Sequence, residues 1–157
     1  MRLRSVNSAS IFALTAEPFK VFRRMLRLRL GSAGGTTICI LTESEHRGCG
    51  VAVVVAEDGV QVWGVVYEIA DIDIRQLDTK EGYKPGRDKN AYCRRECLVF
   101  LEGDEERPLT VCTYFACRQP NPPLPNAGYK DLIVTGARYW HLPEEYVREL
   151  KTIEVDG

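Results

Sequence analysis

The chain has 157 residues, a formal net charge of −1 and 45% hydrophobic residues. This length and composition fit one folded domain and exclude an intrinsically disordered protein. No run of about 18 apolar residues occurs, so no membrane-spanning helix is predicted. A net charge near zero argues against nucleic acid as a partner of the whole chain.

The charge is distributed unevenly. Residues 1–30 contain seven basic residues and a single acidic one, Glu17, which gives a charge of +6; the remainder has 14 basic and 21 acidic residues and a charge of −7. Such an N-terminal segment has the composition of a mitochondrial transit peptide. The alternative is that it forms a basic first strand and helix of the domain. We therefore separate a basic N-terminal segment, residues 1–35, which is either part of the domain or a leader, from a domain over residues 36–157.

Six cysteines, at positions 39, 49, 93, 97, 112 and 117, raise the question of disulfides or a metal site. No export signal is visible, so free thiols in a cytoplasmic protein are expected, with a mitochondrial location as the alternative. Cys93 and Cys97 fall in a predicted strand, which places them roughly 13 Å apart, too far to chelate one metal. No metal site is predicted.

Three β-rich runs are predicted to be strands, over residues 36–42, 51–56 and 60–69. The second and third flank Asp58-Gly59, which is a strong hairpin signal. Asp71 then caps a short helix with Ile74 and Leu77 on one face, and Gly82 ends it before a polar loop.

The second half of the chain predicts another hairpin, followed by two helices. Strands are expected over residues 91–101 and 109–117, joined by a turn at residues 103–108. The proline-rich run 120–125 is an extended loop, which either is pinned across the domain or binds a proline-recognising partner. Helices are expected over residues 130–137 and from Pro143 onward, with Tyr146, Val147, Leu150 and Ile153 on the packed face of the latter. The fold class is α+β: a small, mostly antiparallel β-barrel-like sheet with a few short peripheral helices.

One acidic residue has an unusual position in the sequence. Glu81 ends the short helix just before Gly82, at the edge of a loop. A surface Glu beside a Lys is ordinarily a solvated charge. Tyr92, Tyr114 and Tyr129, in or beside the later elements, are ordinarily core aromatics.

Four ordered motifs give these residues another interpretation. They are V-W-G-V-V-Y-E-I at 62–69, L-D-T-K-E-G at 77–82, Y-K-D-L-I-V-T-G-A at 129–137 and L-P-E-E-Y at 142–146. Their order and spacing, over roughly two-thirds of the chain, resemble the γ-glutamylcyclotransferase family. The resemblance implies a barrel-like fold and an enzyme that releases 5-oxoproline from γ-glutamyl amino acids or peptides, without cofactor or metal. It implies Glu81 as the catalytic acid/base, and Tyr92, Tyr114 and Tyr129 as substrate-binding residues. A homodimer is left open.

The basic N-terminal segment departs from the sequence pattern of the family. The family's first strand ends in F-A-Y-G-S-N, whose small-residue loop binds the γ-glutamyl group through backbone N–H groups. Here Phe12 and Ala13 match, but Leu14, Thr15, Ala16 and Glu17 occupy the substrate-binding positions. Glu17 would repel a substrate carboxylate. Two alternatives follow: a catalytically silent member that serves as a binding or structural module, and a relative that acts on γ-glutamylamines.

Overall fold

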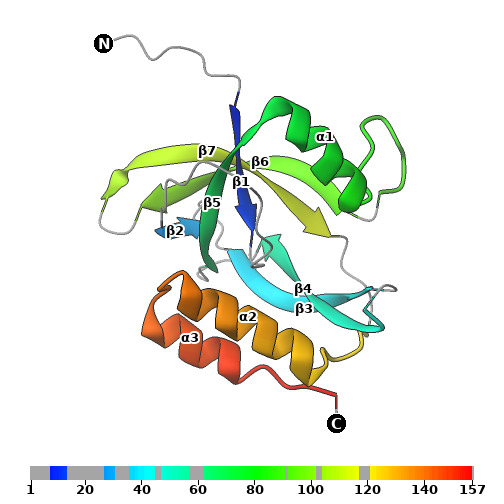
Figure 1. Cartoon of the computed structure of the whole chain (residues 1–157), viewed down its shortest axis with the longest axis vertical. Helices are drawn as coiled ribbons and strands as arrows, with labels where there is room; N and C mark the ends of the chain where they lie inside the picture. Colours follow the sequence, from blue (N-terminus) through cyan, green and yellow to red (C-terminus); the bar gives the residue numbers. More distant parts are fainter. Residues whose placement is uncertain are drawn as a thin grey trace.

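The computed structural model describes residues 8–13, 27–30, 36–44, 47–56, 62–90, 92–101, 104–116 and 121–156 (Figure 1). Its strands are β1 (Ser8–Ala13), β2 (Arg27–Leu30), β3 (Thr36–Ser44), β4 (Cys49–Ala56), β5 (Val62–Ala70), β6 (Tyr92–Leu101) and β7 (Asp104–Ala116). Its helices are α1 (Asp71–Lys80), α2 (Ala127–Tyr139) and α3 (Glu144–Lys151). Within these ranges, none of the helices has the length and apolarity needed to cross a membrane.

Five strands form a barrel-like sheet in the order β1-β5-β2-β6-β7. Each neighbouring pair in this order is antiparallel, and β7 returns to β1 through one parallel pair, Ile11 with Cys112. The predicted α+β class with a mostly antiparallel, barrel-like sheet is confirmed. The basic N-terminal segment contributes β1 and β2 to this sheet.

The predicted hairpin around Asp58-Gly59 is wrong. Those two residues lie outside the described ranges, but the strands on either side belong to different sheets. β4 pairs with β3, whereas β5 pairs with β1 on one edge and β2 on the other. Because both edges of β5 are taken, a local turn signal is overridden by pairing between strands far apart in sequence.

The β6–β7 hairpin is confirmed, from Tyr92 opposite Ala116 to Leu101 opposite Asp104. β7 begins at Asp104 rather than near residue 109, so the connection is shorter than predicted.

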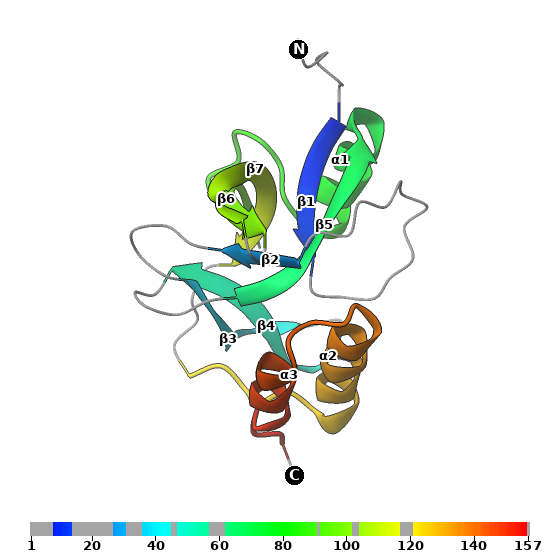
Figure 2. The same ribbon diagram turned by 90° about the vertical axis from the view of Figure 1, so that its left-hand side faces the viewer.

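Two hydrophobic cores lie on opposite sides of β4. Val54 packs against the barrel residues Val62, Val99 and Val111, which are fully buried. Cys49 and Val51 instead pack against α2 and α3 through a cluster that includes Ile133, Val134, Ala137, Tyr146, Val147 and Leu150. The two helices accordingly lie against the β3–β4 layer, on the side away from the barrel (Figure 2). β4 therefore separates the barrel from the pair of helices α2 and α3.

The helices follow the sequence with shifted ends. α1 ends as predicted, and Gly82 turns the chain with a φ of +64°. α2 begins three residues earlier than predicted because the Asn126 side chain accepts the Tyr129 N–H and caps it. Pro143 is the N-cap of α3 rather than part of its first turn.

The proline-rich segment is irregular over residues 121–126, and Pro120 lies outside the described ranges. It is pinned at two points: the Leu124 carbonyl accepts the Gly50 N–H at 3.0 Å, and the Pro125 carbonyl accepts the Asp156 N–H at 2.9 Å. These bonds tie it to β4 and to the C-terminal segment, as expected for a loop pinned across the domain.

Candidate active site

Glu81 follows the last residue of α1. Its N–H donates to the Leu77 carbonyl at 2.9 Å, which continues the helical pattern by one residue before Gly82 turns the chain. The side chain is half-buried, and burial raises the pKa of its carboxyl group above the ordinary value of 4.5. Within the described ranges, no hydrogen bond or ion pair joins this carboxylate to another residue. Glu81 therefore has the desolvation expected of a general base and, among the residues that the structure describes, no partner of the kind expected for a structural ion.

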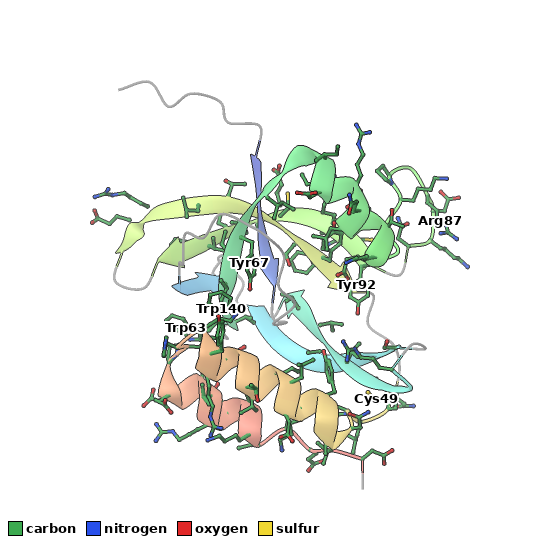
Figure 3. The ribbon with its side chains drawn as sticks, viewed as in Figure 1. Cys49, Trp63, Tyr67, Arg87, Tyr92 and Trp140 are labelled. Atoms are coloured by element: carbon green, nitrogen blue, oxygen red, sulfur yellow. The ribbon has the colours of Figure 1, made fainter. Side chains whose placement is uncertain are left out.

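Tyr92 and Tyr129 lie close enough to Glu81 to sense its charge. Burial, then the Glu81 charge, then Tyr129 raise the pKa of Tyr92 to about 12. Burial raises the pKa of Tyr129 most, and Glu81 raises it further. In Figure 3, Tyr92 points from the barrel toward the β3–β4 hairpin, which carries Cys49. The site thus combines the end of α1, the start of β6 and the first turn of α2.

Tyr129 also joins α2 to β4. Its hydroxyl accepts the Ala52 N–H at 3.1 Å, and its backbone N–H donates to the Asn126 cap at 2.8 Å. Its ring is therefore fixed from two directions while the hydroxyl proton remains available for donation.

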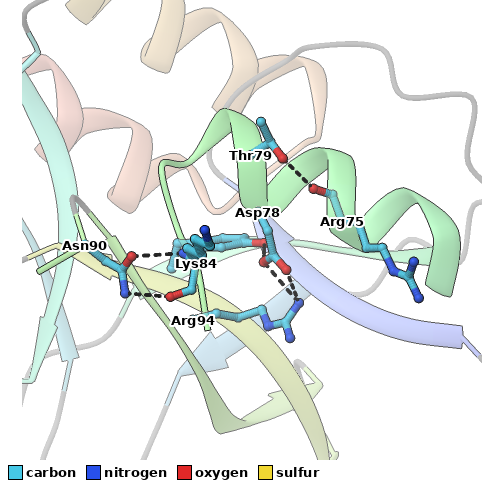
Figure 4. A network of polar contacts seen from close by, with 7 residues as sticks. Arg75, Asp78, Thr79, Lys84, Asn90 and Arg94 are labelled. Carbon is cyan, nitrogen blue, oxygen red and sulfur yellow. Dashed lines mark hydrogen bonds and ion pairs between the residues drawn. The ribbon is translucent and has the colours of Figure 1, made fainter. Parts of the chain in front are cut away.

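The third predicted tyrosine has a different partner. The Tyr114 hydroxyl donates to Asp78 Oδ1 at 2.6 Å, and Arg94 Nη1 donates to both Asp78 carboxylate oxygens at 3.0 and 2.9 Å. Tyr83 packs edge-on against Tyr114 and lies under the Arg94 guanidinium. Figure 4 shows the Asp78–Arg94 ion pair at α1. The structure thus places Tyr92 and Tyr129 near Glu81. It directs the Tyr114 hydroxyl to Asp78, which lies three residues before Glu81.

The loop after Glu81 is held by one side chain that the sequence reasoning missed. Asn90 accepts the Lys84 N–H at 2.9 Å and donates to the Lys84 carbonyl at 3.2 Å (Figure 4). It also donates to the Arg87 carbonyl at 3.3 Å. An asparagine at the end of a Pro-Gly-containing loop is the available signal for such a fastening.

A cavity of about 380 Å³ opens beside Tyr129. The described residues that line it are Arg47, Cys49, Asn126, Gly128 and Tyr129. The Arg47 guanidinium carbon lies 5.3 Å from the centre of the Tyr129 ring, within the range of a cation–π contact. Arg47 and Asn126 were not singled out in the sequence; the only signal is the position of Asn126 three residues before Tyr129, as an N-cap.

The other predicted groups are distributed as follows. Leu14, Thr15, Ala16 and Glu17 lie outside the described residues, directly after β1, whose arrow points toward the β3–β4 hairpin in both ribbon views (Figures 1 and 2). In the described ranges, Cys49, Cys93, Cys97 and Cys112 are free thiols, and no three His, Cys, Asp or Glu side chains converge as metal ligands. Burial, followed by the nearby Cys112, raises the pKa of the Cys97 thiol to about 11.

Comparison with known proteins shows the class to which this fold belongs. The structure matches a solved γ-glutamyl cyclotransferase with a TM-score of 0.78 and 25% sequence identity, covering 95% of this chain and 89% of the other. A model of the AIG2-like family matches residues 61–150, and the chain belongs to that family.

Two curated relatives are γ-glutamylcyclotransferases. The human protein is 33% identical over 154 residues, which cover 98% of this chain and 71% of the relative. The mouse protein is 34% identical over 111 residues, covering 71% of this chain and 55% of the relative. The match thus spans only about half the length of the mouse relative.

Proposed function

We propose that this protein is a γ-glutamylcyclotransferase, which cyclises a γ-glutamyl amino acid or dipeptide and releases 5-oxoproline and a free amino acid. The observation that carries the proposal is the Glu81 carboxyl group, half-buried, without a partner among the described residues, and grouped with Tyr92 and Tyr129. Membership of the AIG2-like family and the similarity to curated cyclotransferases support it.

The reaction moves two protons from the substrate's α-nitrogen to the leaving nitrogen. The α-ammonium loses the first proton to Glu81, and the resulting amine attacks the γ-carbonyl carbon to form a five-membered ring. The bond from that carbon to the leaving nitrogen then breaks as Glu81 gives this proton to the leaving nitrogen. Glu81 next takes the second proton from the ring nitrogen and passes it to the free amine, which departs as an ammonium. A single carboxylate with a raised pKa can serve both transfers. Because ring closure is intramolecular, the protein's further task is to hold a folded substrate conformer.

The two tyrosines supply hydrogen-bond donors to this reaction. With a pKa of about 12, the Tyr92 hydroxyl keeps its proton at neutral pH and can donate to the oxygen that gains negative charge during attack. Tyr129 can donate in the same way while accepting the Ala52 N–H. The mechanism uses no metal or cofactor, because Glu81 serves each proton transfer.

The experiment is to measure 5-oxoproline release from γ-glutamyl-alanine by the full chain, with a metal chelator present. Release that requires Glu81 supports the proposal. No release at millimolar substrate, even after the loop change described next, would favour the silent binding or structural module.

Residues 14–17 set the expected level of activity. Replacing them with Tyr-Gly-Ser-Asn restores the family loop, removes the Glu17 charge and supplies backbone donors for the substrate. We expect kcat/KM to rise at least tenfold, mostly through KM, since a hydrogen bond to a charged group contributes roughly 1.5–3 kcal/mol. An unchanged kcat/KM in an already active chain would show that residues 14–17 are not the equivalent loop.

A further inference from the structure

The loop that follows Glu81 connects two of the groups that the proposed reaction uses. Glu81 precedes the loop, residues 82–90 form it, and Tyr92 begins β6 just after it. The Glu81 charge contributes to the raised pKa of Tyr92, so the two side chains lie near each other. The conformation of this loop therefore influences how the acid/base and the hydroxyl donor are placed relative to each other.

The start of the loop is fixed to α1 and to the β6–β7 hairpin. The Tyr83 N–H donates to the Asp78 carbonyl at 2.8 Å. The Tyr83 ring packs edge-on against Tyr114, with ring centres 6.4 Å apart, and the Arg94 guanidinium carbon lies 5.4 Å from the centre of the Tyr83 ring. Glu81 thus lies between two residues, Asp78 and Tyr83, that both contact this hairpin.

The tip of the loop is a tight turn. Pro85 and Gly86 occupy its central positions, and Gly86 has a φ of +75°. The Arg87 N–H closes the turn by donating to the Lys84 carbonyl at 3.2 Å. Proline followed by a residue with positive φ is the pattern of a type II turn. The turn reverses the chain, and a further contact is needed to attach the end of the loop to its start.

The Asn90 side chain supplies that contact with three hydrogen bonds. Its Oδ1 accepts the Lys84 N–H, and its Nδ2 donates to the carbonyls of Lys84 and Arg87. One side-chain amide can do this because it carries an acceptor and two donors. Lys84 lies three residues after Glu81, and Asn90 lies two residues before Tyr92. These bonds therefore join the chain near the carboxylate directly to the chain near the hydroxyl.

We propose that Asn90 is a positioning residue, which closes the loop onto Lys84 and thereby holds Glu81 and Tyr92 in the geometry that proton transfer requires. The proposal rests on the proposed function, and Asn90 acts through the two side chains rather than on the substrate. Such an effect can be large, because a misplacement of about 1 Å at a reacting group can cost roughly 10²-fold in rate. The competing assignment is that Asn90 stabilises the loop and has no effect on the reaction.

Steady-state kinetics on γ-glutamyl-alanine separate these roles. Asn90→Ala removes all three bonds, so we expect kcat to fall about tenfold with KM nearly unchanged, because proton transfer is misaligned while substrate contacts remain. Asn90→Asp keeps an acceptor for the Lys84 N–H and loses the two donated bonds, so its kcat should be intermediate. Thr79→Val is the matched control. It removes another exposed side-chain bond to the backbone, from Thr79 Oγ1 to the Arg75 carbonyl at 2.9 Å, and should leave kcat unchanged (Figure 4).

A second measurement does not depend on turnover. In chains with ¹³C-labelled tyrosine rings, NMR follows the Tyr92 signal, assigned by its absence in Tyr92→Phe, from about pH 3 to about pH 8. Ionisation of Glu81 should displace this signal with a midpoint above 4.5, and Glu81→Gln should abolish the displacement. Asn90→Ala should reduce the displacement and lower the midpoint toward 4.5, because the carboxylate moves away from the ring and gains water. Thr79→Val should preserve both.

In a chain that releases 5-oxoproline, the proposal requires both effects of Asn90→Ala. A fall in kcat with an unchanged Tyr92 titration, or a changed titration with an unchanged kcat, would overturn it. So would equal losses in Asn90→Ala and Thr79→Val. In a chain that releases no 5-oxoproline, the proposed function fails and the titration alone decides. A changed titration would then keep Asn90 as the residue that places Glu81 beside Tyr92, and an unchanged one would overturn that role as well.

Discussion

Two carboxylates three residues apart on the same helix end have opposite surroundings. Asp78, 8% exposed, receives the Arg94 guanidinium and the Tyr114 hydroxyl. Glu81 is half-buried, has no such partner among the described residues, and has a raised pKa because of burial. The ion pair and the Tyr114 hydroxyl hold α1 on the β6–β7 hairpin, whereas a partly buried carboxylate without such a partner costs stability. A carboxyl group with a raised pKa in such surroundings is a candidate for acid/base chemistry, which is the role that we propose for Glu81.

Replacing Glu81 with Gln gives the largest expected effect. The amide keeps the shape of the side chain but cannot take the amine proton, so we expect 5-oxoproline release to fall by about 10²- to 10⁴-fold. Rate assays on γ-glutamyl-alanine measure this. Turnover near that of the unmodified chain would remove Glu81 from the mechanism.

The same variant has a defined effect on stability. Because the folded-state pKa of Glu81 is raised, the folded chain binds more protons than the unfolded chain at pH values between 4.5 and the raised pKa, and stability falls as pH rises through that window. Glu81→Gln removes this loss, so its free energy of unfolding at pH 7 should equal or exceed that of the unmodified chain. The advantage should vanish below pH 4.5. Destabilisation at pH 7 would mean that the carboxylate has a structural partner.

Replacing Asp78 with Asn should have the opposite effect on stability. The amide leaves the Arg94 charge partly buried and weakens the bond from Tyr114, so we expect a loss of about 2–4 kcal/mol in urea unfolding. The chemistry of the two changes is matched, carboxylate to amide three residues apart. A neutral Asp78→Asn would contradict the anchoring role and the contrast with Glu81.

The anchor could be predicted only in part. Asp71, the spacing of Ile74 and Leu77, and Gly82 predict α1 and its end just after Glu81, because these features depend on local capping and turn chemistry. The partners of Asp78 come from β6 and β7, 16 and 36 residues later. The bond from Tyr114 to Asp78 cannot be predicted from the sequence, because it depends on how the hairpin packs against α1.

The strands β4 and β5 show the same difference between local structure, which can be predicted, and contacts between distant residues, which cannot. Both were predicted as strands from their β-branched runs, but their partners depend on β1 and β2, which are short and lie in the basic head. The contact of Arg47 with the Tyr129 ring gave no signal in the sequence, because it forms only when α2 packs beside the turn before β4. The individual strands and helices could therefore be predicted from the sequence. The contacts that β4 makes with the barrel on one side and with α2 and α3 on the other could not.

A pair of tyrosine variants extends the contrast to hydroxyl groups. Tyr114→Phe removes a 2.6 Å bond to a charged oxygen and should cost about 1.5–3 kcal/mol of stability with little change in kcat. Tyr92→Phe should leave stability nearly unchanged and lower kcat about tenfold. Thermal unfolding and rate assays on both variants measure the two effects. A reversed pattern would place Tyr114 in the reaction and Tyr92 in the framework.

The smallest effect on stability is expected at an ion pair that is exposed to solvent. Arg148 and Glu145 lie 3.5 Å apart on α3, with side chains 69% and 86% exposed, compared with 27% and 12% for Arg94 and Asp78. Water screens the exposed pair, and holding two long side chains together costs rotamer entropy, so Arg148→Gln should change the free energy of unfolding by less than about 0.5 kcal/mol. Urea unfolding at low and at high salt measures it, and added salt should shrink even this difference. A loss comparable to that of Asp78→Asn would mean that burial and the Tyr114 hydroxyl are not what make the Asp78–Arg94 pair an anchor.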